Sequence, residues 1–175
     1  MGLYQVTIAI TVGIFMMLAM GLNIITGYTG QVSLGHAAFF GIGAYTSALL
    51  SVKAGVPFWL ALPMAAVVTG AVGAILGAIS TRLHDDSLAI TTIGINFVVV
   101  SVFQYSQFFG GALGVGGIEY PSVFGRALTK PEYLVVVIVC VSLGIWFDRR
   151  LVRSWLGLAL RSVGQNEEAA ESLGI

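Results

Sequence analysis

The residues best suited to chemistry lie in one glycine-rich stretch, GLNIITGYTGQVSLGHAAFFGIGAYTSALL, at positions 21–50. Its polar side chains are amides, hydroxyls and one imidazole, crowded around Gln31, Ser33 and His36. A helix that begins near Gln31 would present free N–H groups and the positive end of its dipole, which suits an anion such as a carboxylate. Phe39 and Phe40 could then line a place for an apolar side chain. The pattern favours binding of a small solute rather than catalysis.

A structural interpretation of the same stretch stays open. Ser33 could cap a helix after a plain turn, and His36 could pack between helices through hydrogen bonds that only hold them together. Lipid cannot satisfy such polar groups, so they must face either protein or water. The residues alone do not decide between a substrate path and helix packing.

The only other concentration of potential ligands is His84-Asp85-Asp86. Adjacent carboxylates beside a histidine could bind a metal ion, but no further His or Cys cluster completes a site. A solvated turn between helices explains these residues equally well. We therefore predict no metal site and no catalytic residues, so that the chain is not an enzyme.

The C-terminal stretch, GLALRSVGQNEEAAESLGI at 157–175, is far more polar than the sequence before it. Asn166 can cap a helix whose first turn holds Glu167 and Glu168, because acidic residues are favourable at a helix N-terminus. Gly174 can end that helix. The pattern predicts a short solvated helix, which on its own is an ordinary surface element.

The elements that must position these groups are membrane spans. The chain is 57% hydrophobic and 9% charged, against roughly a quarter charged in soluble domains. Uncharged stretches occupy 1–52, 54–81, 87–118 and 133–147. A spanning helix needs about 20 mostly apolar residues. We expect an all-α, polytopic transmembrane bundle with about five spans, at about 5–26, 32–52, 57–80, 87–109 and 132–147.

The orientation follows from the basic residues. The densest cluster is Arg149, Arg150, Arg153 and Arg161, after the fifth predicted span. Basic residues favour the cytoplasmic side, so residues 148–175 are expected there as a cytoplasmic loop. Counting back places the loop 110–131 outside, the turn at 27–31 inside and the N-terminus outside. Arg126 and Lys130 oppose this orientation but are outnumbered. With zero net charge, no basic field is available to attract nucleic acid.

Three stretches together resemble the permeases of branched-chain amino-acid ABC importers, in particular their M-type subunit. They are residues 21–50, the glycine-rich FFGGALGVGGI at 108–118, and 157–175. Two departures stand out: the family's members are considerably longer, and His84-Asp85-Asp86-Ser87 replaces a basic, glycine-containing stretch. By resemblance, residues 1–175 form a single transmembrane permease domain that is incomplete at its C-terminus.

The resemblance implies a mechanism and a set of partners. Glu168, Ala169, Ala170 and Gly174 look like the start of the loop by which ABC permeases meet their ATPase subunits. A periplasmic or extracellular binding protein would deliver leucine, isoleucine or valine, and a second permease subunit would complete the pore. ATP would be used by the partner subunits, with no cofactor bound by this chain, in a bacterial or archaeal plasma (inner) membrane. The alternative is a channel or secondary transporter for a small polar solute, although only His36 is a candidate ionisable residue within a span.

Overall fold

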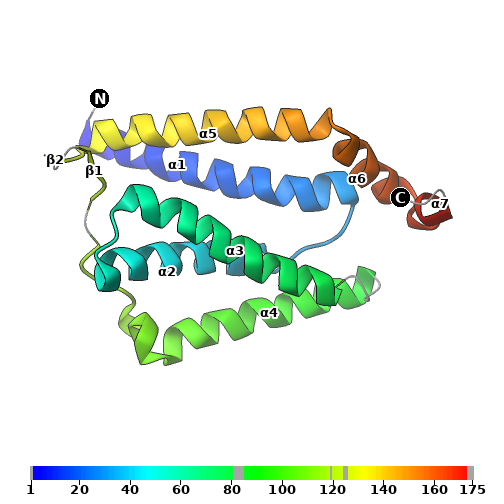
Figure 1. The fold of residues 1–175 in the computed structure, drawn as a ribbon, viewed down its shortest axis with the longest axis horizontal. Coiled ribbons are helices and arrows are strands. Elements are labelled where there is room, and N and C mark those ends of the chain that lie inside the picture. The colour runs from blue at the N-terminus through cyan, green and yellow to red at the C-terminus, as the bar shows by residue number, and fades with distance from the viewer. Residues whose placement is uncertain (1, 81–84, 119, 124–125, 173–175) are drawn as a thin grey trace. The chain divides into compact units, whose positions relative to one another are not determined.

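The computed structural model describes residues 2–80, 85–118, 120–123 and 126–172, and these residues form a predominantly α-helical protein. The long helices are α1 (Leu3–Leu22), α2 (His36–Ala54), α3 (Phe58–Ser80), α4 (Asp85–Tyr105) and α5 (Lys130–Val152) (Figure 1). The shorter elements are α6 (Trp155–Gln165), α7 (Glu167–Ser172), the π-helix η1 (Asn23–Tyr28), the 3-10 helices η2 (Gln107–Phe109) and η3 (Gly111–Leu113), and the strands β1 (Ser122–Val123) and β2 (Arg126–Ala127). The expected all-α polytopic class is confirmed.

The surfaces of the long helices suit lipid. Four helices in the described part of the chain are long and apolar enough to cross a bilayer: Leu3–Tyr28, His36–Ala54, Phe58–Ala78 and Ser87–Tyr105. Large apolar side chains such as Phe15, Val67 and Phe97 are 60–72% exposed. Contiguous exposed apolar surface of this kind is unfavourable in water and favourable in hydrocarbon. The protein is therefore a multi-pass membrane protein.

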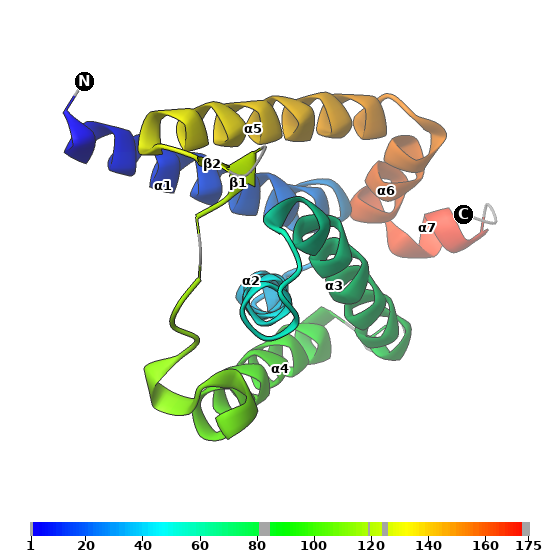
Figure 2. The same ribbon diagram turned by 60° about the vertical axis from the view of Figure 1, so that its left-hand side comes forward.

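The first of two compact units contains residues 1–33 and 129–175. In it, α1 and α5 lie side by side (Figures 1 and 2). Gly13 on α1 faces Val137 and Val141 on α5, and Gly144 further along α5 faces Met20 further along α1. Since both numbers increase together, the two helices run parallel. Pro131 occupies the first turn of α5, a position that suits proline, and the Thr129 N–H donates to the Glu132 carboxylate at 2.7 Å to close a capping box.

The second unit contains residues 34–128 and centres on α2, which packs against both α3 and α4. Most of its buried side chains are alanines, Ala38, Ala48, Ala61 and Ala65, and Leu88 is buried as well. Small residues let helix backbones approach closely where no apolar driving force between helices exists. Close backbone packing therefore contributes to holding this unit together.

One end of this second unit is held by aromatic and polar contacts. Tyr45 of α2 stacks on Phe103 of α4, with ring centroids 4.1 Å apart. The Lys53 Nζ donates to the Phe108 carbonyl at 2.7 Å and lies 3.8 Å from the centre of its ring. The Trp59 indole donates to the Ser122 carbonyl at 2.9 Å. These contacts attach the glycine-rich loop after α4 to the ends of α2 and α3.

Several predicted boundaries require correction. The fourth predicted span ends at Tyr105 rather than 109, because the chain turns into η2 and then η3, where Gly110 and Gly111 have φ of 87° and 60°. The fifth predicted segment forms α5, a helix of 23 residues with charged residues in its first and last turns. The total of five spans stays a prediction, supported by the parallel contact of α5 with the span-length helix α1.

Candidate functional site

The predicted substrate path begins where α1 ends. Instead of stopping near residue 26, the helix widens into the π-helix η1, which continues to Tyr28. Gly30 follows with φ of 72°, a left-handed conformation that favours glycine and turns the chain out of the helix. A π-helical turn within an otherwise α-helical element occurs frequently at functional sites. No periodic pattern in the sequence indicates this turn.

The next helix does not begin near Gln31. The first residue of α2 is His36, and its N-cap is Gly35 rather than Ser33. The Leu34 N–H donates to Thr92 Oγ1 of α4 at 3.2 Å, and a β-carbon on Gly35 would lie 2.8 Å from the Thr92 carbonyl oxygen. This close approach to α4 holds residues 34 and 35 outside the helix. The expected helix N-terminus at Gln31 is therefore wrong by about one turn.

The predicted path residues fall into both units. Gln31 and Ser33 belong to the first unit and are half-buried, whereas His36, Phe39 and Phe40 lie on the first turns of α2 in the second unit. Phe39 is half-buried and lies near Gly73 of α3, while Phe40 is 47% exposed. His36 is half-buried at the first position of α2. The three α2 residues share a helix but differ in environment, and their role in a path stays a prediction.

The glycines of α2 admit neighbouring helices. Gly41 and Gly43 both lie in a regular helix. A β-carbon on Gly41 would lie 3.2 Å from the Phe103 ring of α4, and one on Gly43 would lie 3.2 Å from Thr69 Oγ1 of α3. These glycines admit neighbouring helices on two sides of α2, which is the general use of small residues in membrane bundles.

The predicted cytoplasmic segment contains two helices, α6 and α7. The first five residues of this segment, 148–152, still belong to α5, which continues to Val152. The predicted cap of α7 is confirmed, since the Ala169 N–H donates to Asn166 Oδ1 at 3.0 Å. Ala170 is 3% exposed and Ala169 is exposed. The helix therefore presents one buried and one open face.

Parts of the predicted coupling motif and of the metal hypothesis cannot be placed. Gly174 and His84 lie outside the described residues, as does the side chain of Glu168, although its backbone belongs to α7. Within the described residues, no group of three or more metal-ligating side chains gathers in one place.

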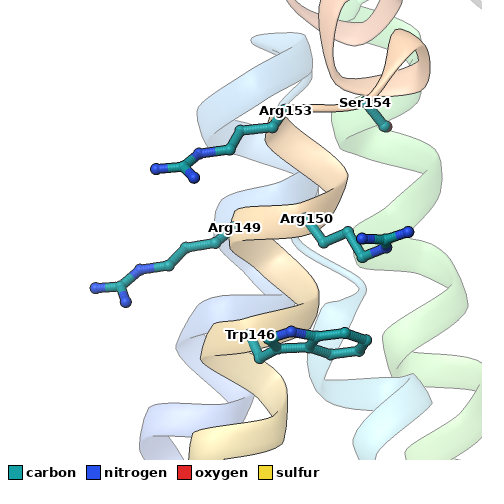
Figure 3. Close-up of a pocket in the computed structure, with 5 residues that line it drawn as sticks. All are labelled: Trp146, Arg149, Arg150, Arg153 and Ser154. Atoms are coloured by element: carbon teal, nitrogen blue, oxygen red, sulfur yellow. The ribbon is translucent and has the colours of Figure 1, made fainter.

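The basic cluster forms a site that the sequence did not predict in detail. A cavity of about 480 Å³ at the end of α5 is lined by Trp146, Arg149, Arg150, Arg153 and Ser154 (Figure 3). The Arg150 guanidinium lies 5.9 Å from the centre of the Trp146 ring, while Arg149 and Arg153 extend together on another side of the helix. Tryptophan and arginine side by side are typical of a membrane interface.

A second cavity, of about 470 Å³, lies in the second unit. It is lined by Ser51, Val52, Gly55, Val56, Pro57, Phe58, Gly117, Tyr120 and Ser122. These residues come from the turn between α2 and α3 and from the loop after α4. Under the predicted orientation the turn between α2 and α3 and the loop after α4 lie on the outer side, so this cavity is expected to open there.

Comparison with known proteins identifies the family. Residues 4–175 match the family model described as branched-chain amino acid transport system / permease component. The chain is 33% identical over 98% of its length to the high-affinity branched-chain amino acid transport system permease protein LivM of Salmonella typhimurium, and 32% identical over 97% to LivM of Escherichia coli. It is 24% identical over 83% of its length to the nucleoside ABC transporter permease protein NupC of Lactococcus lactis. No solved structure matches.

The match extends over all the helices described above but not over whole relatives. The chain spans 46% of each LivM protein and 51% of NupC. Because the family model covers nearly every residue, the chain belongs to the branched-chain amino acid transport system permease family.

Proposed function

We propose that the chain is the transmembrane permease part of an ATP-driven importer for branched-chain, hydrophobic amino acids. The observation that carries this proposal is the identity of about one third to the LivM permeases over nearly the whole chain. The lipid-compatible helices and the absence of a phosphate-binding loop from these 175 residues fit a permease whose ATPase is a separate subunit. The chain itself then binds and conducts a solute and catalyses no reaction.

The partners follow from the same proposal. ATPase subunits would bind the open face of α7, a second permease subunit would complete the pore, and a binding protein would deliver the amino acid from outside the plasma membrane. A nucleoside cargo is a second candidate because the NupC permease is also similar. A channel or secondary transporter is the remaining alternative.

Reconstituted transport separates these candidates. The assembled transporter is placed in proteoliposomes loaded with ATP or a non-hydrolysable analogue, with the binding protein and labelled leucine or uridine outside. Leucine uptake that requires hydrolysable ATP supports the proposal. Uridine uptake in place of leucine indicates a nucleoside importer, and leucine uptake without ATP indicates a secondary transporter or channel.

The predicted orientation gives the next test. In a Cys140→Ser background, a cysteine at the exposed Ser122 should react with an impermeant thiol reagent added outside the cell, and one at the exposed Gln165 should react only after the membrane is opened. The physical reason is the arginine cluster at the end of α5, which favours the cytoplasmic side. Labelling in the reverse order would show that the orientation is wrong.

The path hypothesis is tested with Ser33→Ala and His36→Ala. If these groups border the path, both variants should keep the wild-type melting temperature and lose transport, by about tenfold, because each removes a polar contact with the solute. Thr46→Ala is a matched control on α2, since its hydroxyl only donates to the Ile42 carbonyl within the helix. A lowered melting temperature with normal transport per folded molecule would assign both residues to helix packing.

A further inference from the structure

The π-helical end of α1 is held by a tyrosine that reaches two other helices. The Tyr28 hydroxyl donates to Asp148 Oδ2 at the cytoplasmic end of α5, at 3.1 Å. The Arg161 guanidinium of α6 lies 5.5 Å from the centre of the Tyr28 ring. Tyr28 and Asp148 are both half-buried. One side chain therefore connects η1 to α5 and α6 within the first unit.

This arrangement is more than a stabilising contact. The second carboxylate oxygen of Asp148, Oδ1, is buried and accepts no hydrogen bond from the described residues. A buried, unsatisfied acceptor costs free energy, so a site selected only for stability would avoid it. The free oxygen leaves Asp148 able to accept a different hydrogen bond when neighbouring groups move.

The contact between α6 and η1 is also unusually close. A β-carbon on Gly164 of α6 would lie 2.6 Å from the Tyr28 carbonyl oxygen and 3.0 Å from the Thr29 carbonyl carbon. A β-carbon on Gly30 would in turn lie 3.6 Å from the Gly164 carbonyl oxygen. The contact is between backbone atoms, so rotating a side chain cannot make room for a methyl group added at Gly164. Movement of α6 must therefore displace residues 28–30.

This contact matters because α6 is also joined to α7. α6 packs against α7, whose Ala170 is buried, and Asn166 both ends α6 and caps α7. We therefore expect α6 and α7 to move together as one piece. Residues 28–30 lead directly into Gln31 and Ser33, the predicted path residues of the same unit.

We infer that Tyr28, Asp148 and Gly164 form a coupling contact that transmits movement of α6 and α7 to the π-helical end of α1 and so to residues 29–33. The inference rests on the proposed ATP-driven function. Tyr28 and Gly164 act as positioning residues: neither needs to touch the ATPase or the solute. Breaking the contact should leave ATP hydrolysis running without driving transport.

The test measures ATP hydrolysed and leucine transported in the same proteoliposomes of the assembled transporter. For Gly164→Ala we expect near-normal hydrolysis and a transport rate lower by about tenfold, because the contact is between backbones. For Tyr28→Phe, which removes one hydrogen bond, the ATP used per leucine should rise about three- to tenfold. Gly70→Ala is the matched glycine control, since nothing lies within 4 Å of its added β-carbon.

Conservative substitutions distinguish coupling from folding. Asp148→Asn keeps an oxygen that can accept from Tyr28 and should retain coupling, whereas Asp148→Ala should match Tyr28→Phe, and combining the two should add little. Wild-type ATP per leucine in both Tyr28→Phe and Asp148→Ala overturns the inference. It is also overturned if hydrolysis, transport and melting temperature fall in proportion. Failure of the wild-type protein to transport leucine with ATP would instead reject the proposed function.

Discussion

Replacing Ala169 with arginine is expected to abolish ATP-driven uptake while leaving the permease folded. Ala169 is on the open face of α7, whereas the neighbouring Ala170 is 3% exposed and packs within the protein. A long cation on the open face does not disturb the contact of α7 with α6, but it would obstruct the proposed binding of an ATPase subunit to that face. We expect uptake to fall by at least about tenfold, as for loss of an interface hot spot.

The measurement combines uptake with co-purification of the ATPase subunits and thermal unfolding of the permease alone. Gln165→Arg is the control, because Gln165 is exposed at the end of α6 and is not part of the predicted motif. Ala170→Arg should behave differently and lower the melting temperature, since its side chain has no space. Normal uptake and normal co-purification of the Ala169→Arg variant would show that α7 does not bind the ATPase.

Replacing Gly35 with valine should destabilise the second unit. The β-carbon would lie 2.8 Å from the Thr92 carbonyl oxygen and 3.2 Å from Thr92 Cβ. The backbone of Gly35 has φ of −93°, which any residue adopts, so the cost arises from overlap with α4 and not from strain in the turn. Overpacking of this kind costs about 1–3 kcal/mol. The melting temperature in detergent and the yield of monodisperse protein should both fall.

Gly94→Val on α4 itself provides the matched control, because nothing lies within 4 Å of a β-carbon there. Thr92→Val keeps the side-chain volume and removes the hydroxyl that accepts from the Leu34 N–H, so it should cost about 1 kcal/mol. If Gly35→Val unfolds at the same temperature as Gly94→Val, the close contact between the start of α2 and α4 does not exist in the bilayer.

The fold class was predictable from the sequence because a bilayer imposes a length and a charge rule on each span. Uncharged stretches located the long helices α1 to α5. The places where these helices begin and end were less predictable. The start of α2 depends on Thr92, which is 57 residues further along the chain than Gly35, and no local pattern reports that contact.

The candidate site was predictable only in part for the same reason. The Asn166 cap is a local interaction, and the sequence identified it. The partners of Tyr28 are not local: Asp148 is 120 residues away, and Gly164 resembles any other helical glycine until its contact is seen. The π-helix was also missed, since a wider turn leaves the apolar pattern of α1 unchanged. The sequence shows polar groups between residues 23 and 36, but it does not show which groups they contact in the folded protein.

The parallel pairing of α1 with α5 has a consequence for biosynthesis. The two helices touch along their length, yet Tyr28 and Asp148, which meet at one end of the pair, are 120 positions apart. At a synthesis rate of about 5–20 residues per second, α1 leaves the ribosome roughly 6–24 s before its partner. During that interval α1 must reside in the membrane without α5, with Gly13 and its neighbours facing lipid or the insertion machinery. Its segment, Leu3–Tyr28, is also the most apolar of the four candidate spans, so it can remain inserted in the membrane before α5 has been synthesised.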